Sequence, residues 1–273
     1  MSESAAPRVL LTGASAGIGL EIARRLTAHG CEVWGTSREP ARLPPIPRFH
    51  GVTMDLLHGQ SIREGLAAAL AQAPGFDVLI NNAGAGVFGP AETVGAELAQ
   101  EQFQLLVHGP MELIRRVLPH MREQQRGRIL NLTSLAGEFP IPYLGAYCAA
   151  KAALSAYSRC LRLELAHTPI HVVDVQPGDI CTGFHRAMQR VFGQPPSGDP
   201  AREAAVWEAH ARHMAAAPPP RRVAETVWRV IQHPDPPPVV TVGGWFQASL
   251  GPLAARFGSR RWVDRVLAWY YGC

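Results

Sequence analysis

The stretch Arg8-Val-Leu-Leu-Thr-Gly13-Ala-Ser-Ala-Gly17-Ile-Gly19 decides the fold of this 273-residue chain. Its apolar start ends at a glycine and predicts a buried strand, and the helical pattern from Leu20 to His29 follows the glycines. A glycine turn between a strand and a helix lets the backbone approach a diphosphate beside the free N–H groups of the helix N-terminus. A glycine-rich turn without a ligand is the alternative. The predicted cradle consists of Gly13, Ser15, Gly17, Ile18 and Gly19.

Apolar runs and helical patterns then alternate along the chain. Such alternation favours a single α/β domain over residues 1–273, with a doubly wound parallel sheet that has helices on both faces and ligands at the carboxyl ends of its strands. The proline-rich segment 39–47 predicts a loop where a crossover helix would otherwise stand. The further predicted strands are 31–37, 48–56, 76–80, 127–134, 170–176 and 238–243, and the helices are 60–73, 92–123 with a break near 109–110, 146–166, 201–217 and 223–232.

Tyr147 and Lys151 lie four residues apart in the predicted helix 146–166 and therefore share one face. A free tyrosine titrates near ~10, and a neighbouring ammonium would lower its pKa by roughly three units into the range useful for acid–base catalysis. Lys151 is the only lysine among 26 basic residues, which indicates that this position needs a compact cation and not a guanidinium. Ser134 ends a predicted strand, so the three side chains form the candidate catalytic group.

The end of the second predicted strand bears on cofactor choice. Cofactors with a bare adenosine ribose usually meet an acid there, whereas those with a 2′-phosphate meet an arginine. The sequence reads Thr36-Ser37-Arg38, so we expect NADP(H) to be preferred over NAD(H), with Arg38 and Ser15 at the 2′-phosphate. Asp55, followed by Leu56, ends the third strand, where a carboxylate could accept a hydrogen bond from the adenine amino group.

Composition excludes several other classes of protein. Hydrophobic residues make up 47% of the chain and charged residues 18%, which is typical of a globular protein. The net charge is +4, but the arginines are scattered, so nucleic-acid binding is not expected. Five widely spaced cysteines without a CxxC pair indicate reduced thiols in a cytoplasm and no zinc site. Neither a signal peptide nor a run of about eighteen apolar residues is evident.

Two segments are expected to border the substrate. Residues 183–220 predict a lid, within which His210 and His213 are expected on a solvated helix face and not as metal ligands. The aromatic, arginine-rich extension 245–273 contains Trp245, Trp262 and Trp269. It could cap the cleft, pack on a partner subunit or make peripheral contact with a membrane.

Together these motifs resemble the short-chain dehydrogenase/reductase family, in the group with TGxxxGxG and YxxxK motifs. The resemblance covers about residues 8–244 and rests on TGASAGIG, Asp55, NNAG, the Ser134, Tyr147 and Lys151 group, and PGDICT. It implies a Rossmann-type domain with a seven-stranded parallel sheet, commonly in a homodimer or homotetramer. Tyr147 is then the general acid or base, Ser134 holds the substrate oxygen, and Lys151 lowers the tyrosine pKa and binds the nicotinamide ribose. The remaining implied cofactor contacts are Asn82, Ala83 and Gly84 on the adenosine side, and Pro177, Gly178, Ile180 and Thr182 around the nicotinamide.

One departure from the family pattern concerns Leu106, three residues before Gly109, where many relatives have an asparagine that anchors a water. The nearby His108 is not expected to replace it. The leading hypothesis is an NADP(H)-dependent oxidoreductase that interconverts a carbonyl and an alcohol on a lipophilic substrate, with an acyl-carrier-protein thioester as a second substrate class. The alternative is a dinucleotide-binding sensor or scaffold with weak or no catalysis.

Overall fold

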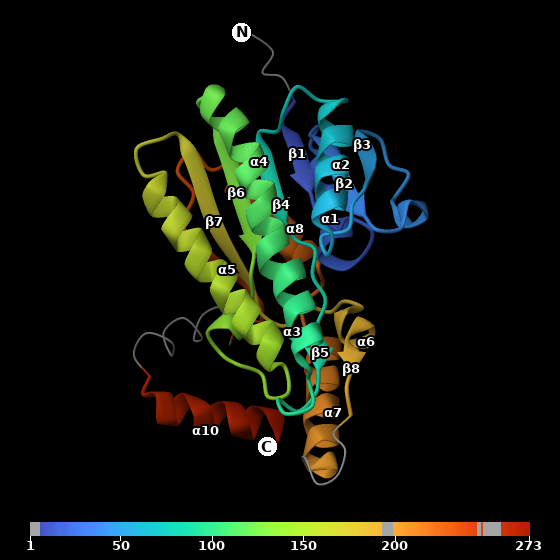
Figure 1. Ribbon diagram of the computed structural model, residues 1–273. Helices are drawn as coiled ribbons and strands as arrows, with labels where there is room; N and C mark the ends of the chain where they lie inside the picture. Colours follow the sequence, from blue (N-terminus) through green and yellow to red (C-terminus); the bar gives the residue numbers. More distant parts are fainter. Residues whose placement is uncertain (1–5, 193–198, 245–246, 248–257) are drawn as a thin grey trace.

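Seven parallel strands form the central sheet in the order β3-β2-β1-β4-β6-β7-β9. The computed structural model describes residues 6–192, 199–244, 247 and 258–273. The sheet confirms the expected doubly wound α/β fold, and every strand predicted from the sequence is present (Figure 1). The strands are β1 (Arg8–Leu11), β2 (Glu32–Ser37), β3 (Phe49–Thr53), β4 (Val78–Asn81), β6 (Gly127–Leu132), β7 (Ile170–Pro177) and β9 (Val239–Val242).

Helices cover both faces of the sheet. Because side chains alternate along a strand, Val9 and Leu11 of β1 join one apolar cluster and Leu10 joins another. The first cluster is completed by α1 (Gly17–Ala28) and α8 (Arg221–Gln232). The second is completed by α2 (Gly59–Leu70), α4 (Gly109–Glu123) and α5 (Gly145–Glu164). Burial on both faces explains why the central strands β1 and β4 are mostly apolar and do not alternate with polar residues.

The connection between β2 and β3 contains a single 3₁₀ turn, η1 (Pro40–Arg42), in place of a full helix. Proline fixes its own backbone φ and cannot donate a main-chain hydrogen bond, so a proline-rich segment does not sustain a longer helix. The expectation of a loop over residues 39–47 is confirmed.

The long helical segment before β6 contains an irregular turn. α3 (Ala96–Phe103) continues through a π-helical turn, η2 (Gln104–His108), directly into α4. The irregularity precedes Gly109-Pro110, close to the expected break. Leu106 lies within the π turn and is 1% exposed, and its side chain lies against Gly84. The irregular turn therefore forms although position 106 is a leucine and not an asparagine.

Several elements gather beyond one end of the sheet (Figure 1). They are α6 (Phe184–Ala187), α7 (Pro200–Ala216), α10 (Arg260–Tyr271), the 3₁₀ turn η3 (Leu135–Gly137), and two short parallel strands, β5 (Val87–Phe88) and β8 (Gln189–Arg190). The predicted lid thus contains α6, β8 and α7, and the predicted C-terminal extension contains α10. Trp245 and lid residues 193–198 lie outside the described residues.

The cysteines and the helices of the described residues bear on two expectations from composition, reduced thiols and the lack of a membrane-spanning segment. All five cysteines lie within it, and each has a free thiol. None of the described helices combines the length and the hydrophobicity that crossing a bilayer requires.

Candidate active site

One cavity of about 1050 Å³ extends from the glycine turn after β1 to α10. Every residue that the sequence assigns to cofactor binding or catalysis lines this cavity. The set comprises Gly13, Ser15, Gly17, Ile18, Gly19, Arg38, Asp55, Leu56, Asn82, Ala83, Gly84, Ser134, Tyr147, Lys151, Pro177, Gly178, Ile180 and Thr182.

The glycine turn is packed tightly against the end of β4. Gly13 has a φ of +69°, and a Cβ atom there would lie 2.8 Å from the Cα of Ala83. A Cβ atom on Gly19 would lie 2.1 Å from the carbonyl oxygen of Gly13. The Asn82 side chain donates to the carbonyl oxygens of Thr12 and Gly13 at 2.9 and 3.1 Å. Larger side chains are thereby excluded, and the backbone forms the surface of the cavity.

The N-terminus of α1 opens into the same part of the cavity. The helix begins at Gly17, and no described side chain caps its first turn at Ala16. The first N–H groups of a helix have no partner within the helix and carry a partial positive charge. Residues 15–19 line the cavity at this point. The cradle therefore fits the diphosphate of a dinucleotide.

The end of the cavity that the sequence predicts to hold the adenosine carries basic side chains. Arg38 and Arg42 both line it, and Arg42 pairs with Glu39 at 3.1 Å, so the nearest carboxylate is already engaged. Asp55 also lines the cavity and accepts a hydrogen bond from the backbone N–H of Leu57 at 3.0 Å. Arg42 was not predicted from the sequence, although it falls in the proline-rich loop that follows Arg38.

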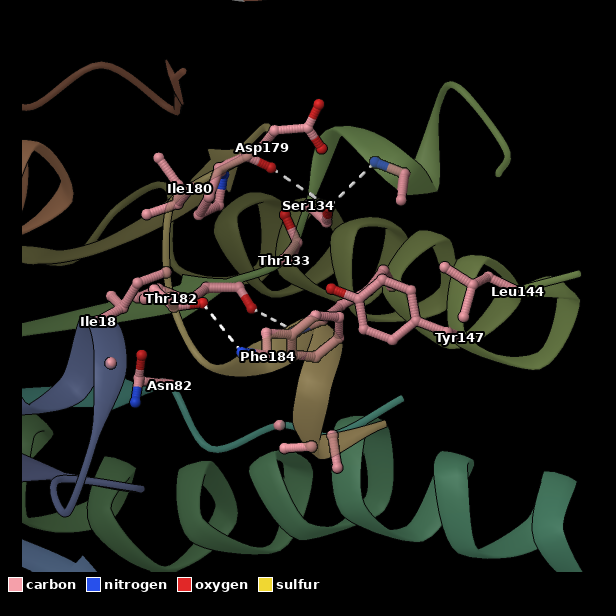
Figure 2. A pocket seen from close by; sticks show the side chains of 18 of the residues that line it. Ile18, Asn82, Thr133, Ser134, Leu144, Tyr147, Asp179, Ile180, Thr182 and Phe184 are labelled. Carbon is pink, nitrogen blue, oxygen red and sulfur yellow. Dashed lines mark hydrogen bonds between the residues drawn. The ribbon is translucent and has the colours of Figure 1, made fainter. Parts of the chain in front are cut away.

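Ser134 and Tyr147 lie at the other end of the cavity (Figure 2). The Ser134 hydroxyl donates to the carbonyl of Pro177 at 3.2 Å and accepts the backbone N–H of Ala136 at 3.1 Å. These two bonds fix the hydroxyl between the end of β6 and the end of β7. Tyr147, near the start of α5, is buried beside Phe184, and their ring centroids are 5.5 Å apart.

Lys151 lies one helical turn after Tyr147 and is 5% exposed. Its ammonium group donates to the carbonyl of Leu132 at 2.7 Å and lies 5.8 Å from the centre of the Tyr147 ring. Burial lowers the pKa of Lys151 from 10.5 to about 8, and the negative charge of Asp174 partly opposes this shift.

The pKa of Tyr147 moves in the opposite direction to the one expected from the sequence. Burial raises it above its ordinary value, the Ser134 hydroxyl lowers it, and Cys148 and Asp179 add smaller upward contributions. Desolvation is the largest of these effects, and the Lys151 ammonium donates its hydrogen bond to the Leu132 carbonyl and not to the phenol. The expected acidic phenol is therefore wrong for this geometry, in which Tyr147 is held in its protonated form at neutral pH.

A buried carboxylate, Asp174, lies near Lys151. Asp174 of β7 is 1% exposed and accepts hydrogen bonds from Thr133, Ser155 and Gln176. Its charge raises the pKa of Lys151 and helps to keep the ammonium charged in a buried position. Asp174 was not predicted from the sequence, although an acidic side chain among the valines of this strand is a signal that could have indicated it.

His210 is buried and His213 is half-buried against neighbouring elements, so the expectation of a solvated helix face is wrong. His210 is 2% exposed, and its Nδ1 atom lies 2.8 Å from that of His185 in α6. The His213 ring stacks on Tyr270 of α10 with centroids 3.9 Å apart. Among the described residues, no group of three His, Cys, Asp or Glu side chains could hold a metal ion. His108 is exposed and lies outside the cavity that contains Tyr147.

Comparison with known proteins gives a consistent result. The family described as "short chain dehydrogenase" matches residues 7–190. A curated protein of Bacteroides thetaiotaomicron, named 3-ketodihydrosphingosine reductase, is 33% identical over 90% of this chain and 88% of its own length. A short-chain dehydrogenase structure from Streptomyces avermitilis has a TM-score of 0.80 at 30% identity and covers 97% of this chain and 99% of its own.

A second solved structure bears on the cofactor. It is the closed form of a serine dehydrogenase complexed with NADP⁺, with a TM-score of 0.74, 29% identity and coverage of 86% of this chain and 94% of its own. These similarities do not favour a sensor or scaffold without catalysis. The chain belongs to the short-chain dehydrogenase/reductase family of oxidoreductases, which act on CH–OH groups with a nicotinamide cofactor.

Proposed function

We propose that this protein is an NADP(H)-dependent reductase that interconverts a lipophilic ketone and its alcohol. The observation that carries the proposal is the apolar wall of the cavity beside Ser134 and Tyr147. It includes Phe139, Ile141, Leu144, Phe184, Met214 and Leu267. A wall of this kind favours a substrate with a long apolar portion, since burial of apolar surface contributes most of the binding free energy.

The chain's own groups suit proton transfer to a carbonyl oxygen. Tyr147 stays protonated at neutral pH because burial raises its pKa, so its hydroxyl is available as the proton donor in the reduction direction. Ser134, held by Pro177 and Ala136, would orient the same oxygen. Lys151 supplies a nearby positive charge that stabilises the phenolate formed when the proton leaves.

The nicotinamide supplies the hydride to the carbonyl carbon in reduction and accepts it in oxidation. Pro177, Gly178, Ile180 and Thr182 would hold its ring, with Lys151 at its ribose and the α1 N-terminus at the diphosphate. Arg38 and Arg42 support a 2′-phosphate and hence NADP(H) over NAD(H).

A long-chain 3-keto lipid is the proposed substrate class. The Bacteroides thetaiotaomicron relative is named for 3-ketodihydrosphingosine, and the similarity extends over most of both chains. An acyl-carrier-protein thioester is the second candidate. It is favoured by the exposed Arg260, Arg261 and Arg265 of α10, the helix whose other residues line the cavity.

Peripheral contact with a lipid surface is part of the same proposal. Trp262 and Trp269 of α10 are 55% and 81% exposed and share the helix with the three exposed arginines. Tryptophan and arginine side chains together favour the interface of an anionic membrane. Because α10 also lines the cavity, a lipid could pass from the membrane to Tyr147 along this helix.

Three further expectations remain proposals. A single domain over residues 1–273 is supported by the contribution of the predicted lid and extension to the same cavity. A homodimer or homotetramer is supported by Leu163 of α5, which is 71% exposed. A cytoplasmic location is supported by the free thiols.

The test measures NADPH binding and long-chain ketone reduction for the unaltered protein and for Tyr147→Phe. The substitution should lower kcat by about 10²- to 10⁴-fold while the dissociation constant for NADPH stays within about twofold. Tyr157→Phe, on the same helix but outside the cavity, is the matched control. NADPH binding by the unaltered protein without reduction of any ketone would contradict the proposed function.

A further inference from the structure

Asp179 is a carboxylate in the substrate end of the cavity that the proposed reaction leaves without a role. It follows Pro177-Gly178 at the end of β7 and lines the cavity. Its Oδ2 atom accepts hydrogen bonds from the Gln247 side-chain amide at 2.7 Å and from the Tyr270 hydroxyl at 3.2 Å. Both donors are neutral, so they orient the carboxylate without neutralising it.

Asp179 lies close to the catalytic groups. The Pro177 carbonyl that holds Ser134 is only two residues away, a stretch of chain that spans at most ~7 Å. The negative charge of Asp179 contributes to the raised pKa of Tyr147, in agreement with this placement. Figure 2 shows Asp179, Ser134 and Tyr147 lining the same pocket.

The surroundings of Asp179 offer no described positive side chain as a partner. Among the described residues that line the cavity, Arg38 and Arg42 belong to the adenosine end, and Lys151 is bonded to Leu132. His210 stays neutral at physiological pH, because burial lowers its pKa to about 4. The carboxylate therefore lies in the largely apolar part of the cavity. In the proposed function, the carbonyl group of the substrate reacts in this same part.

We propose that Asp179 binds a positively charged amino group on the carbon next to the substrate's carbonyl, so that the preferred substrate class is long-chain 2-amino ketones. The inference rests on the proposed function and deepens it. An ammonium group would form a charge-assisted hydrogen bond with the carboxylate, while the alkyl chain occupies the apolar wall. Asp179 would thus determine specificity, and Ser134 and Tyr147 would act on the adjacent carbonyl.

The competing explanation is that Asp179 only fastens α10 to the end of β7 through Tyr270 and Gln247. The two roles predict different patterns. A fastening role predicts that Tyr270→Phe and Asp179→Asn harm all substrates alike. A recognition role predicts that Asp179→Asn harms only substrates with a positive charge and that Tyr270→Phe retains the selectivity.

The experiment compares 2-aminododecan-3-one, its N-acetyl derivative and dodecan-3-one as substrates with NADPH at neutral pH. The unaltered protein should prefer the free amine by about tenfold or more in kcat/KM. Asp179→Asn should lower kcat/KM for the amine by about ten- to a hundredfold, mainly through KM, and leave both neutral ketones within about twofold. Tyr270→Phe should keep the preference for the amine.

Each other outcome overturns a specific claim. Equal or better reduction of dodecan-3-one by the unaltered protein would overturn the role of Asp179 and leave the proposed reductase function intact. Parallel losses on all three ketones in Asp179→Asn would assign the residue to fastening α10. Failure of the unaltered protein to reduce any of the three would reject the reductase function on this substrate class, and the inference with it. The substrate comparison on the unaltered protein does not depend on whether a variant folds.

Discussion

The Nδ1 atoms of His185 and His210 lie 2.8 Å apart in the interior between α6 and α7. A single hydrogen bond between two imidazole rings needs one donor and one acceptor, so the pair is satisfied with both rings neutral. Burial lowers the pKa of both rings, that of His210 from 6.5 to about 4, with Asp179 acting against the shift and His213 adding to it.

The first prediction concerns acid stability. Between pH 6.5 and 4 the unfolded chain binds more protons at His210 than the folded chain does, so the free energy of unfolding should fall as the pH falls through this window. The contribution is at most about 3 kcal/mol. Denaturant unfolding of the unaltered protein and of His210→Gln at several pH values measures it. An equal slope in the two proteins would show that His210 does not contribute.

The second prediction concerns Lys151. Because its pKa is lowered to about 8, the ammonium loses its proton above that pH, and with it the charge proposed to stabilise the Tyr147 phenolate. We expect kcat for ketone reduction to be highest below pH 8 and to fall above it with a midpoint near 8. A pH–rate profile at saturating NADPH checks this. A rate that stays constant well above that pH would argue against an electrostatic role for Lys151.

The third prediction concerns the glycine turn. Gly19→Ala would place a methyl group 2.1 Å from the Gly13 carbonyl oxygen and 2.5 Å from the Asn82 amide nitrogen. The turn must shift, which should cost about 1–3 kcal/mol of stability and weaken NADPH binding. Thermal unfolding and a binding titration measure the two effects. Gly145→Ala, where a Cβ atom meets nothing within 4 Å, is the control and should weaken neither stability nor NADPH binding.

The fourth prediction concerns cofactor choice. Arg38→Ala should weaken NADP⁺ binding by about tenfold and leave NAD⁺ binding nearly unchanged, because only the former carries a 2′-phosphate. Since Arg38 is exposed, the difference should shrink as salt is added. Arg24→Ala, on the exposed face of α1 and outside the cavity, is the matched control. Equal loss of affinity for both cofactors would contradict the assignment.

The fifth prediction concerns α10 and lipid surfaces. Replacing both Trp262 and Trp269 with Ser should reduce co-sedimentation with anionic vesicles several-fold, because the two exposed indoles are removed from the proposed contact. Leu70→Ser removes an exposed apolar side chain from α2 and should have no effect. Vesicle binding that survives the double substitution would exclude α10 as the contact surface.

Much of the fold could be predicted from the sequence because its elements are long and apolar. The strand from Ile170 and the helix around Tyr147 each carry a clear pattern over many residues. In contrast, α6 has four residues and β5 and β8 have two each, too few for any period to show. These short elements depend on contacts between segments that are distant in the sequence, such as β5 with β8.

The electrostatics of the site were harder to predict for the same reason. Spacing correctly indicates that Tyr147 and Lys151 share a helix face, but it does not show how deeply the pair is buried. Desolvation then decides the pKa of Tyr147. Likewise, the neighbours of Asp179 come from residues 68 and 91 positions further along the chain. No local pattern could reveal that arrangement.

The burial of Lys151 has a practical consequence, because it is the only lysine in the sequence. An acylating reagent directed at primary amines would therefore find a single side-chain target, which lies buried at the wall of the cavity beside Tyr147. The mass increase of the peptide that contains Lys151, followed over time, would then record how accessible this side chain is to solvent. Protection by added nucleotide would test the proposed position of Lys151 beside the nicotinamide ribose without any catalytic assay.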